Sequence, residues 1–302
     1  MSRRIRIGIH PQSPAGPVLL RAPAFEAARQ ALADTVEWVW YAHGTMTPAQ
    51  FASGAIDVAL TGATPPITIQ AAGADIVYLA VGQPRPRSGA IVVPKDSPVQ
   101  RLQELAGRRI GFAVGSWHTA FVALALDGVG RSFRDITPVS FVDSAGRVDP
   151  SIVDAWVARP EEIDAPALRT LAVVGDVWSN RSVSFARREA VAQAPEALGR
   201  FVAALDAAGR WLGRHPAEAA ALLEQGSPVA RDALERGIRQ QSGAEGLGPA
   251  GAAFAQEQQR VADVLAAAGV LAGVRIGDAV DSASAAVWAH AQAARGEAAL
   301  DA

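Results

Sequence analysis

The stretch Asp57-Val-Ala-Leu-Thr-Gly-Ala-Thr-Pro-Pro-Ile-Thr-Ile-Gln70 has the pattern of a strand, a tight turn and a helix. Residues 57–60 are a short apolar strand, and residues 61–63 form the turn. We place Thr64 at the helix N-cap and the following Pro-Pro pair in the first helical turn, where a missing N–H costs nothing. The N–H groups left free at the positive end of the helix dipole suit a bound anion. Capped turns of this kind are common, so a turn that binds nothing is the alternative.

Strands and helices alternate around this stretch. The pattern predicts strands at residues 5–9, 36–41, 56–60 and 76–81, separated by helices within 17–33 and at 47–53 and 64–72. Such spacing is typical of βαβ units in a mainly parallel sheet, where ligands bind beyond the carboxyl ends of the strands.

A second α/β unit follows a connector. Residues 83–89 contain two prolines, two arginines and a glycine, and strands are predicted after them at 90–94 and 109–114. Residues 115–119, Gly-Ser-Trp-His-Thr, repeat the strand-turn-helix pattern. We therefore expect two such turns, one from each unit, to face each other across a cleft. From about residue 189 the chain becomes alanine-rich and predicts helices at 189–214, 216–225, 229–241 and 252–268.

Composition excludes several classes of function. The chain has 302 residues, 50% of them hydrophobic, and a formal net charge of -2 without a basic stripe, so neither nucleic acid nor an anionic membrane surface is an expected partner. It contains no cysteine, which excludes disulfides, thiolate metal ligands and cysteine nucleophiles. No metal-type spacing of His, Asp and Glu occurs, and we expect neither a metal nor a cofactor.

The N-terminus bears on localisation. Met1-Ser2-Arg3-Arg4 leads directly into the first strand, without the basic, apolar and small-residue succession of a secretory signal. We expect a cytoplasmic protein if the chain is native as written, and a periplasmic or cell-surface protein if an export segment was removed.

Three segments resemble the substrate-binding proteins of ABC importers, specifically the aliphatic sulfonate, taurine and nitrate group. They are residues 57–67, 89–98 and 105–116, supported by residues 153–156 and 195–201. The resemblance implies the α/β periplasmic-binding-protein type II fold, with two Rossmann-like lobes and a cleft between them. Lobe 1 would comprise residues 1–85 and 184–302, and lobe 2 residues 86–183. The implied partners are a small sulfonate-like anion, bound by hinge closure in a monomer, and an ABC permease.

The implied site lies on both lobes. Thr61, Thr64, Ser116 and Thr119 would donate hydroxyl groups to the anion, and Trp117 and Trp156 would form apolar walls for its tail. His118 would add a donor if protonated. The full set of predicted ligand-binding residues is Gln12, Thr61, Gly62, Thr64, Ser88, Gly89, Ser116, Trp117, His118, Thr119 and Trp156. Arg85 and Arg87 lie near the hinge, and we interpret them as solvated linker charges.

The chain also departs from the family pattern. Its first strand ends Gly-Ile-His-Pro-Gln at residues 8–12 where the family has Gly-Tyr-Gln, Ala63 replaces a common aspartate, and Trp117 stands where small residues are usual. These departures indicate a reshaped pocket. A cytoplasmic enzyme on the same fold, acting on a sulfinate, a sulfonate or a thiamine precursor, remains an alternative, with His10, His43 and His118 as candidates. A ligand sensor is the third possibility.

Overall fold

The structure, a computed structural model, describes residues 3–140, 148–163, 165–225, 227, 229–240 and 246–300. The strands are β1 (Ile5–Ile9), β2 (Val36–Trp40), β3 (Val58–Thr61), β4 (Ile76–Gly82), β5 (Ala90–Pro94), β6 (Arg109–Gly111), β7 (Thr137–Val139), β8 (Ala155–Ala158), β9 (Leu168–Val173), β10 (Val183–Arg187) and β11 (Leu247–Gly248). The α-helices are α1 (Ala15–Arg21), α2 (Glu26–Leu32), α3 (Thr47–Ala52), α4 (Thr64–Ala71), α5 (Trp117–Asp127), α6 (Val174–Val177), α7 (Arg188–Gln193), α8 (Pro195–Arg214), α9 (Pro216–Glu224), α10 (Arg231–Gln240), α11 (Ala252–Ala267) and α12 (Ser282–Leu300). The 3₁₀ helices are η1 (Pro23–Phe25), η2 (Gly44–Met46), η3 (Leu102–Leu105), η4 (Phe133–Asp135), η5 (Pro160–Glu162) and η6 (Ile276–Ala279).

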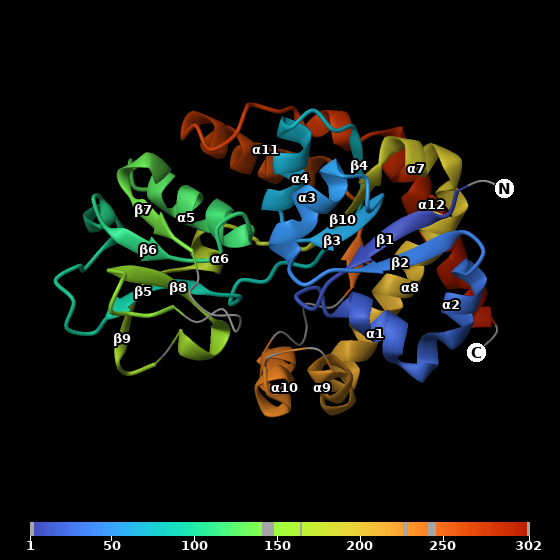
Figure 1. Cartoon of the computed structure of the whole chain (residues 1–302), viewed down its shortest axis with the longest axis horizontal. Helices are drawn as coiled ribbons and strands as arrows, with labels where there is room; N and C mark the ends of the chain where they lie inside the picture. Colours follow the sequence, from blue (N-terminus) through green and yellow to red (C-terminus); the bar gives the residue numbers. More distant parts are fainter. Residues whose placement is uncertain are drawn as a thin grey trace.

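These elements form two sheets that lie side by side (Figure 1). The first has six strands in the order β11-β4-β10-β3-β1-β2, with β1 parallel to β2 and β3, and β10 antiparallel to β3 and β4. The second has five strands in the order β7-β6-β8-β5-β9. We call the elements around the six-stranded sheet the first lobe and those around the five-stranded sheet the second lobe. The predicted α/β class with two Rossmann-like lobes is confirmed; the residue boundaries assigned to the lobes stay a prediction.

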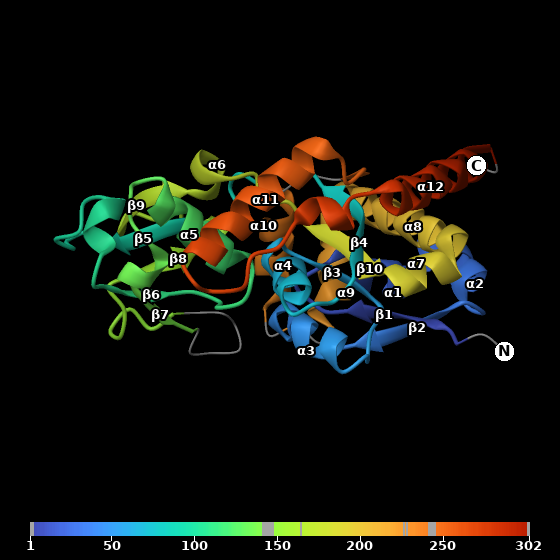
Figure 2. The same cartoon turned by 90° about the horizontal axis from the view of Figure 1, so that it is seen from above.

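Alternating side chains place a core on each face of the first sheet. Val58 and Leu60 of β3 belong to a cluster with α1, α8 and α12, whereas Ala59 belongs to a second cluster with α3, α4 and α11. That second cluster continues into the second lobe through α5, which packs against α4 and α11 (Figure 2). The two lobes therefore share one apolar contact region along this side.

Two segments interrupted before a proline are 17–33, predicted to contain a helix, and 189–214, predicted to be one helix. Ala22 has an extended conformation (φ -72°, ψ 130°) and precedes Pro23, so the segment 17–33 divides into α1, η1 and α2. Ala194 (φ -151°, ψ 64°) precedes Pro195 and separates α7 from α8. The ring of a proline disfavours helical geometry in the residue before it, which accounts for both breaks.

Other boundaries also differ from expectation. Strand β6 ends at Gly111, three residues before the predicted end. Helix α12 and the two-residue strand β11, which pairs with β4, were not expected from the sequence pattern. Within the part of the chain that the structure describes, no helix is long and apolar enough to cross a membrane.

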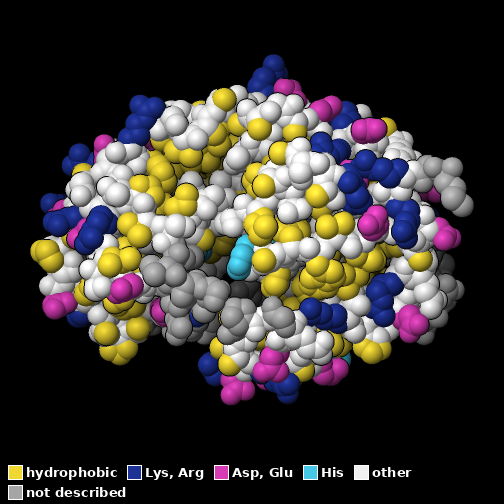
Figure 3. All heavy atoms as spheres, viewed as in Figure 1, with side chains coloured by type: hydrophobic (Ala, Val, Ile, Leu, Met, Phe, Trp, Pro, Cys, Tyr) yellow, Lys and Arg dark blue, Asp and Glu magenta, His cyan; other side chains and the backbone are white. Residues whose placement is uncertain are grey.

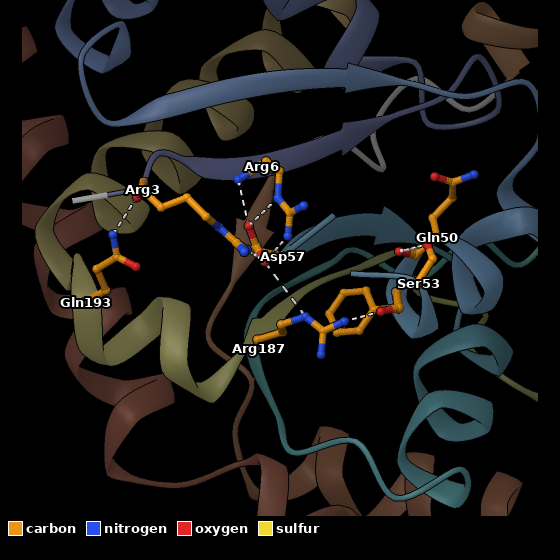
Figure 4. Close-up of polar contacts among 8 residues, drawn as sticks. Arg3, Arg6, Gln50, Ser53, Asp57, Arg187 and Gln193 are labelled. Atoms are coloured by element: carbon orange, nitrogen blue, oxygen red, sulfur yellow. Dashed lines mark hydrogen bonds and ion pairs between the residues drawn. The ribbon is translucent and has the colours of Figure 1, made fainter. Parts of the chain in front are cut away.

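An ion network fastens the amino end of the first sheet (Figure 4). Asp57, just before β3, is 4% exposed and accepts hydrogen bonds from Arg3 Nη2 (2.7 Å) and from Arg6 Nε and Nη2 (both 3.0 Å). Arg187, at the end of β10, places its Nε 3.8 Å from the same carboxylate and donates from Nη2 to the Phe51 carbonyl. One carboxylate thus ties together β1, β3 and β10.

Candidate functional site

Two chain segments connect the lobes where the carboxyl ends of β3 and β4 meet the start of β10. Residues 83–89 lead from β4 into β5, and residues 178–182 lead back into β10. The segments are hydrogen bonded to each other, from Gly82 N–H to the Ser182 carbonyl and from Arg85 N–H to the Ser179 carbonyl, both at 2.8 Å. The surface is hollowed where the lobes meet, and a histidine side chain lies at the rim of the hollow (Figure 3).

The β3–α4 turn carries a hydroxyl group without a partner. Thr64 is 2% exposed, and its Oγ1 is buried and forms no hydrogen bond with any residue that the structure describes. The predicted N-cap was wrong by one residue: Ala63 already has helical dihedrals (φ -71°, ψ -31°), so Thr64 is the first helical residue. Threonine at this position cannot cap its own helix, which explains why its hydroxyl is left unpaired.

That one-residue shift also changes the backbone donors of the turn. Because Thr64 is the first helical residue, the two prolines take the next two positions, and neither has an N–H. The backbone bonds outside regular elements include none donated by Ala63 or Thr64 to a described residue. The donors of this turn that bond to no described residue therefore include these two N–H groups and the Thr64 hydroxyl.

The β6–α5 turn, by contrast, is closed on itself. Ser116 is the N-cap of α5: its Oγ accepts from His118 N–H (3.1 Å) and donates to the Ala113 carbonyl (2.7 Å). Thr119 Oγ1 accepts from Gly115 N–H (2.8 Å). His118 Nδ1 accepts from Ala113 N–H (3.2 Å), and burial lowers the pKa of His118 to about 3. The imidazole is therefore neutral near pH 7, and the condition under which His118 would add a donor, its protonation, is not met at that pH.

The β3–α4 and β6–α5 turns contact each other through Trp117. A Cβ added at Gly62 would lie 2.9 Å from Trp117 Cβ, and one added at Gly89 would lie 3.0 Å from Trp117 Cη2. The indole thus extends from the β3–α4 turn to the connector. Its close approach requires a glycine at both positions, and whether the indole also lines a ligand pocket stays a prediction.

Trp156 and Gln12 lie farther out. Trp156 packs against Ala90 and Ala158 in a cluster separate from the one that Trp117 contacts, so the structure does not bring the two indoles together. Gln12 is exposed and accepts from Gly44 N–H (2.9 Å), close to His10 Nδ1 (3.0 Å). His10 Nε2–H donates to the Leu60 carbonyl (2.7 Å), which fixes this group at the carboxyl edge of the first sheet.

Asn180 and Arg85 were missed as site candidates. Ser88 is 9% exposed; it accepts from Asn180 Nδ2 (2.7 Å) and donates to the Arg85 carbonyl (2.8 Å). Arg85 Nε donates to the Asn180 carbonyl (2.9 Å), and burial lowers the pKa of Arg85 to about 10. The interpretation of Arg85 as a solvated linker charge was therefore wrong. Asn180 has a φ of 45°, a value that asparagine tolerates better than most residues. The choice of asparagine for this turn is the only trace of its role that the sequence carries.

The described residues hold no group of three or more His, Asp or Glu side chains that would suit a metal ion. The polar groups gathered here are hydroxyls, backbone N–H groups, a neutral imidazole and a guanidinium. Such a set donates hydrogen bonds and suits an anion.

Curated proteins of known name match the chain in part. A protein of Escherichia coli K12 with the provisional name aliphatic sulfonates-binding protein is 35% identical over 123 residues, which are 40% of this chain and 39% of that protein. A protein of Bacillus subtilis 168 with the same provisional name is 28% identical over 249 residues, 78% of this chain and 74% of that protein. The match thus spans well under half of the first relative and about three quarters of the second.

Solved structures match over almost the whole chain. The periplasmic aliphatic sulphonate binding protein SsuA of Escherichia coli has a TM-score of 0.78 at 23% identity, covering 93% of this chain and 92% of that one. The alkanesulfonate-binding protein SsuA of Xanthomonas axonopodis pv. citri, bound to MOPS, has a TM-score of 0.76 at 25% identity, covering 93% and 98%. The expected periplasmic-binding-protein fold is confirmed.

The family assignment rests on a profile described as NMT1/THI5 like, which matches residues 35–219. This range includes the β3–α4 turn, both connecting segments and the whole second lobe. Since the match spans more than half of its length, the chain belongs to the NMT1/THI5-like family.

Proposed function

We propose that this protein is the solute-binding component of an ABC importer and that it binds a small organic anion, an aliphatic or aryl sulfonate, in the cleft between its lobes. The names of the relatives support the ligand class, and the fold supports a cleft as the place of binding. The proposal includes lobe 1 at residues 1–85 and 184–302, lobe 2 at residues 86–183, and closure by bending of the connecting segments 83–89 and 178–182.

The observation that carries the proposal is the unpaired hydroxyl of Thr64. A buried hydroxyl without a hydrogen bond costs about 1–3 kcal/mol, so a protein retains one where a partner arrives later. The hydroxyl stands in the first turn of α4, next to two unbonded backbone N–H groups and near the positive end of the helix dipole. An oxyanion of the ligand would accept from all three donors.

A sulfonate suits these donors because it is ionised at every physiological pH. Its recognition needs donors and dipoles, with no proton to be taken up or released. Trp117, which reaches from Gly62 to Gly89, provides an apolar wall for the alkyl or aryl tail beside the anionic head group. The residues proposed to contact the ligand directly are Thr61, Gly62, Thr64, Ser88, Gly89 and Trp117. The other predicted site residues, which we place farther from the unpaired donors of the β3–α4 turn, are Gln12, Ser116, His118, Thr119 and Trp156.

Binding without turnover is part of the proposal. The chain has no cysteine, and His118 uses Nδ1 to accept from the backbone, so it is poorly placed as a general base. We propose a monomer that delivers its ligand to an ABC permease, outside the cytoplasmic membrane once an export segment has been removed.

The test is a thermal-shift screen followed by titration calorimetry. The panel contains ethanesulfonate, hexanesulfonate, benzenesulfonate, taurine, MOPS, sulfate, nitrate and a sulfinate. A ligand present at a hundred times its dissociation constant raises the free energy of unfolding by about 2.7 kcal/mol, which gives a clear shift. We expect organic sulfonates to stabilise the protein and to be recovered unchanged. No shift with any sulfonate would refute the proposal, and conversion of the ligand would favour an enzyme.

Thr64→Val sharpens the test because it keeps the shape of the side chain and removes the hydroxyl. We expect its affinity for the best sulfonate to fall by about 1–2 kcal/mol, roughly five- to thirty-fold. Thr68→Val is the matched control, because Thr68 lies one turn farther along α4 and its Oγ1 donates to the Thr64 carbonyl (3.2 Å). Equal affinities of the two variants would remove Thr64 from the site.

A further inference from the structure

We propose that Arg85, in the connector between the lobes, supplies the positive charge that neutralises the ligand's anionic head group. This inference rests on the proposed function and adds a specificity-determining residue to it. It assigns recognition of the anion to the hinge itself as well as to the two facing turns.

The charge of Arg85 has no counterpart in the part of the chain that the structure describes. Its side chain donates from Nε to the Asn180 carbonyl (2.9 Å) and from Nη2 to Asn180 Oδ1 (3.4 Å), and both acceptors are neutral. No carboxylate of the described residues forms an ion pair with it, and burial alone lowers the pKa of its guanidinium to about 10. The group nevertheless stays charged near pH 7, so an unneutralised cation is held at the hinge.

The carboxylate that contacts the returning segment, residues 178–182, already has hydrogen-bond partners. Glu257, on α11, accepts from the Ser179 N–H (3.1 Å) and hydroxyl (2.7 Å), and its Oε2 lies 3.9 Å from Arg181 Nε. This bond network ties the returning segment to α11 and holds Asn180 in place. Of Arg181 and Arg85, the first is neutralised by Glu257, whereas the second has no carboxylate partner among the described residues.

Arg85 lies at the same edge of the first sheet as the unpaired donors of the β3–α4 turn, which are the Thr64 hydroxyl and the N–H groups of Ala63 and Thr64. Strand β10 lies between β3 and β4, and Val183 is in register with Thr61 on one side and with Val81 on the other. Residues that immediately precede β10 and follow β4 are therefore neighbours of the turn that follows β3. The Trp117 indole approaches both Gly62, in that turn, and Gly89, at the end of the connector. It therefore lies between the turn and the connector that carries Arg85.

The chemistry of arginine suits this place. The guanidinium presents five donors in a planar fork, of which Asn180 takes one from Nε and one from Nη2. The remaining N–H groups have no acceptor among the described residues, and a fork of this kind binds an oxyanion with two hydrogen bonds. Its hydrogen bonds to Asn180, which is fully buried, orient the guanidinium before the ligand arrives.

The test compares Arg85→Met, Arg85→Lys and Arg87→Met with the wild type by titration calorimetry. Arg87 is exposed and two residues away, so Arg87→Met is a control for the same loss of charge in the connector. The probes are hexanesulfonate and its uncharged analogue hexyl methyl sulfone. We expect Arg85→Met to bind hexanesulfonate at least ten-fold more weakly and to lose the preference for the sulfonate over the sulfone. Arg85→Lys should fall between, and Arg87→Met should stay within about two-fold of the wild type.

The melting temperature of the ligand-free protein separates a ligand role from a structural one. Removing the charge relieves its desolvation but leaves the buried Asn180 without two donors, so the melting temperature of Arg85→Met should change by no more than a few degrees. A lowered melting temperature with an unaltered preference for the sulfonate would make Arg85 a structural residue and overturn the inference. If the wild type binds hexanesulfonate and Arg85→Met binds it equally well, only this inference fails. If the wild type binds no sulfonate of the panel, the proposed function fails as well.

Discussion

The two ends of the six-stranded sheet use their polar groups in opposite ways. At the amino end, the Asp57 carboxylate is surrounded by Arg3, Arg6 and Arg187, and its hydrogen-bonding capacity is filled from within the chain (Figure 4). At the carboxyl end, neither the Thr64 hydroxyl has a partner nor Arg85 a counter-ion among the residues that the structure describes. Substitution should therefore reduce stability at the amino end and ligand affinity at the carboxyl end.

The largest effect on stability is expected from Asp57→Asn. Removing the carboxylate leaves three guanidinium groups without their shared counter-ion, and breaking a buried pair in this way costs several kcal/mol. Because the arginines are partly exposed, we expect a loss of about 2–3 kcal/mol in the free energy of unfolding, measured by urea denaturation. Sulfonate affinity should be unchanged.

Asp75→Asn provides the control for that experiment. Asp75 pairs with Arg188 (2.9 Å) but its side chain is 68% exposed, so its removal should cost less than about 1 kcal/mol. Equal losses for the two variants would mean that the Asp57 network contributes no more than a surface ion pair.

Gly62→Ala should have the next largest effect, because it acts on the contact between the lobes. The new Cβ would lie 2.9 Å from Trp117 Cβ, and neither atom is the flexible end of a side chain, so the two turns must separate. Overpacking of this kind costs about 1–3 kcal/mol, and we expect a weaker sulfonate affinity in addition. Calorimetry and urea denaturation measure the two effects.

Gly209→Ala on α8 is the matched glycine substitution. Nothing lies within 4 Å of its added Cβ, so the variant should gain about 0.5–1 kcal/mol of stability from its helical position. A Gly62→Ala variant that behaves in the same way would show that the two turns are not in contact in solution.

Much of the fold was predictable because its signals are local. Strand β5 has the bounds that the apolar run and Pro94 suggest, and α5 begins directly after the Ser116 cap. The breaks before Pro23 and Pro195 were also readable, since the residue before a proline avoids helical geometry. We expected a continuous helix only over 189–214, because strong helix formers continue across Pro195.

The site was less predictable because it depends on long-range contacts and on single dihedral angles. Whether Thr64 caps α4 depends on the backbone of Ala63, which no side-chain pattern specifies. Arg85 and Asn180 are 95 residues apart, so the sequence offered no reason to separate Arg85 from the exposed Arg87. The hydrogen bond between Arg85 and Asn180 can be recognised only when the positions of both connecting segments in the folded chain are known.

Replacing the threonine of each turn by valine should change the free energy of unfolding by a smaller amount, with opposite signs in the two turns. Thr119→Val removes the acceptor of Gly115 N–H and should lower the free energy of unfolding by about 1 kcal/mol. Thr64→Val removes a hydroxyl that has no partner and should leave stability unchanged or raise it by up to about 1 kcal/mol. A loss of stability in both variants, measured by urea denaturation, would show that Thr64 has a partner within the folded chain.

The smallest expected effect is the pH dependence of the free energy of unfolding, which again compares the two ends of the six-stranded sheet. Burial raises the pKa of Asp57, but hydrogen bonds from Arg6 and Arg3 outweigh it and hold that pKa below its usual value. A carboxylate with a depressed pKa contributes its full stability above the unfolded pKa of about 3.9 and loses it as the pH falls through the folded value. The difference in stability between the wild type and Asp57→Asn should therefore be constant from about pH 5 to 7 and shrink below about pH 4.

At the carboxyl end the same pH range should have no effect on binding. The sulfonate and Arg85 both keep their charges, and the lowered pKa of His118, about 3, keeps its imidazole neutral above pH 4. Sulfonate affinity measured at pH 5 and at pH 7 should thus agree within about two-fold, which RT ln 2 places below 1 kcal/mol. An affinity that rises several-fold at pH 5 would point to a histidine that gains a proton on binding, and His10, whose Nε2–H is bonded to the Leu60 carbonyl at the same edge, would be the group to examine by His10→Gln.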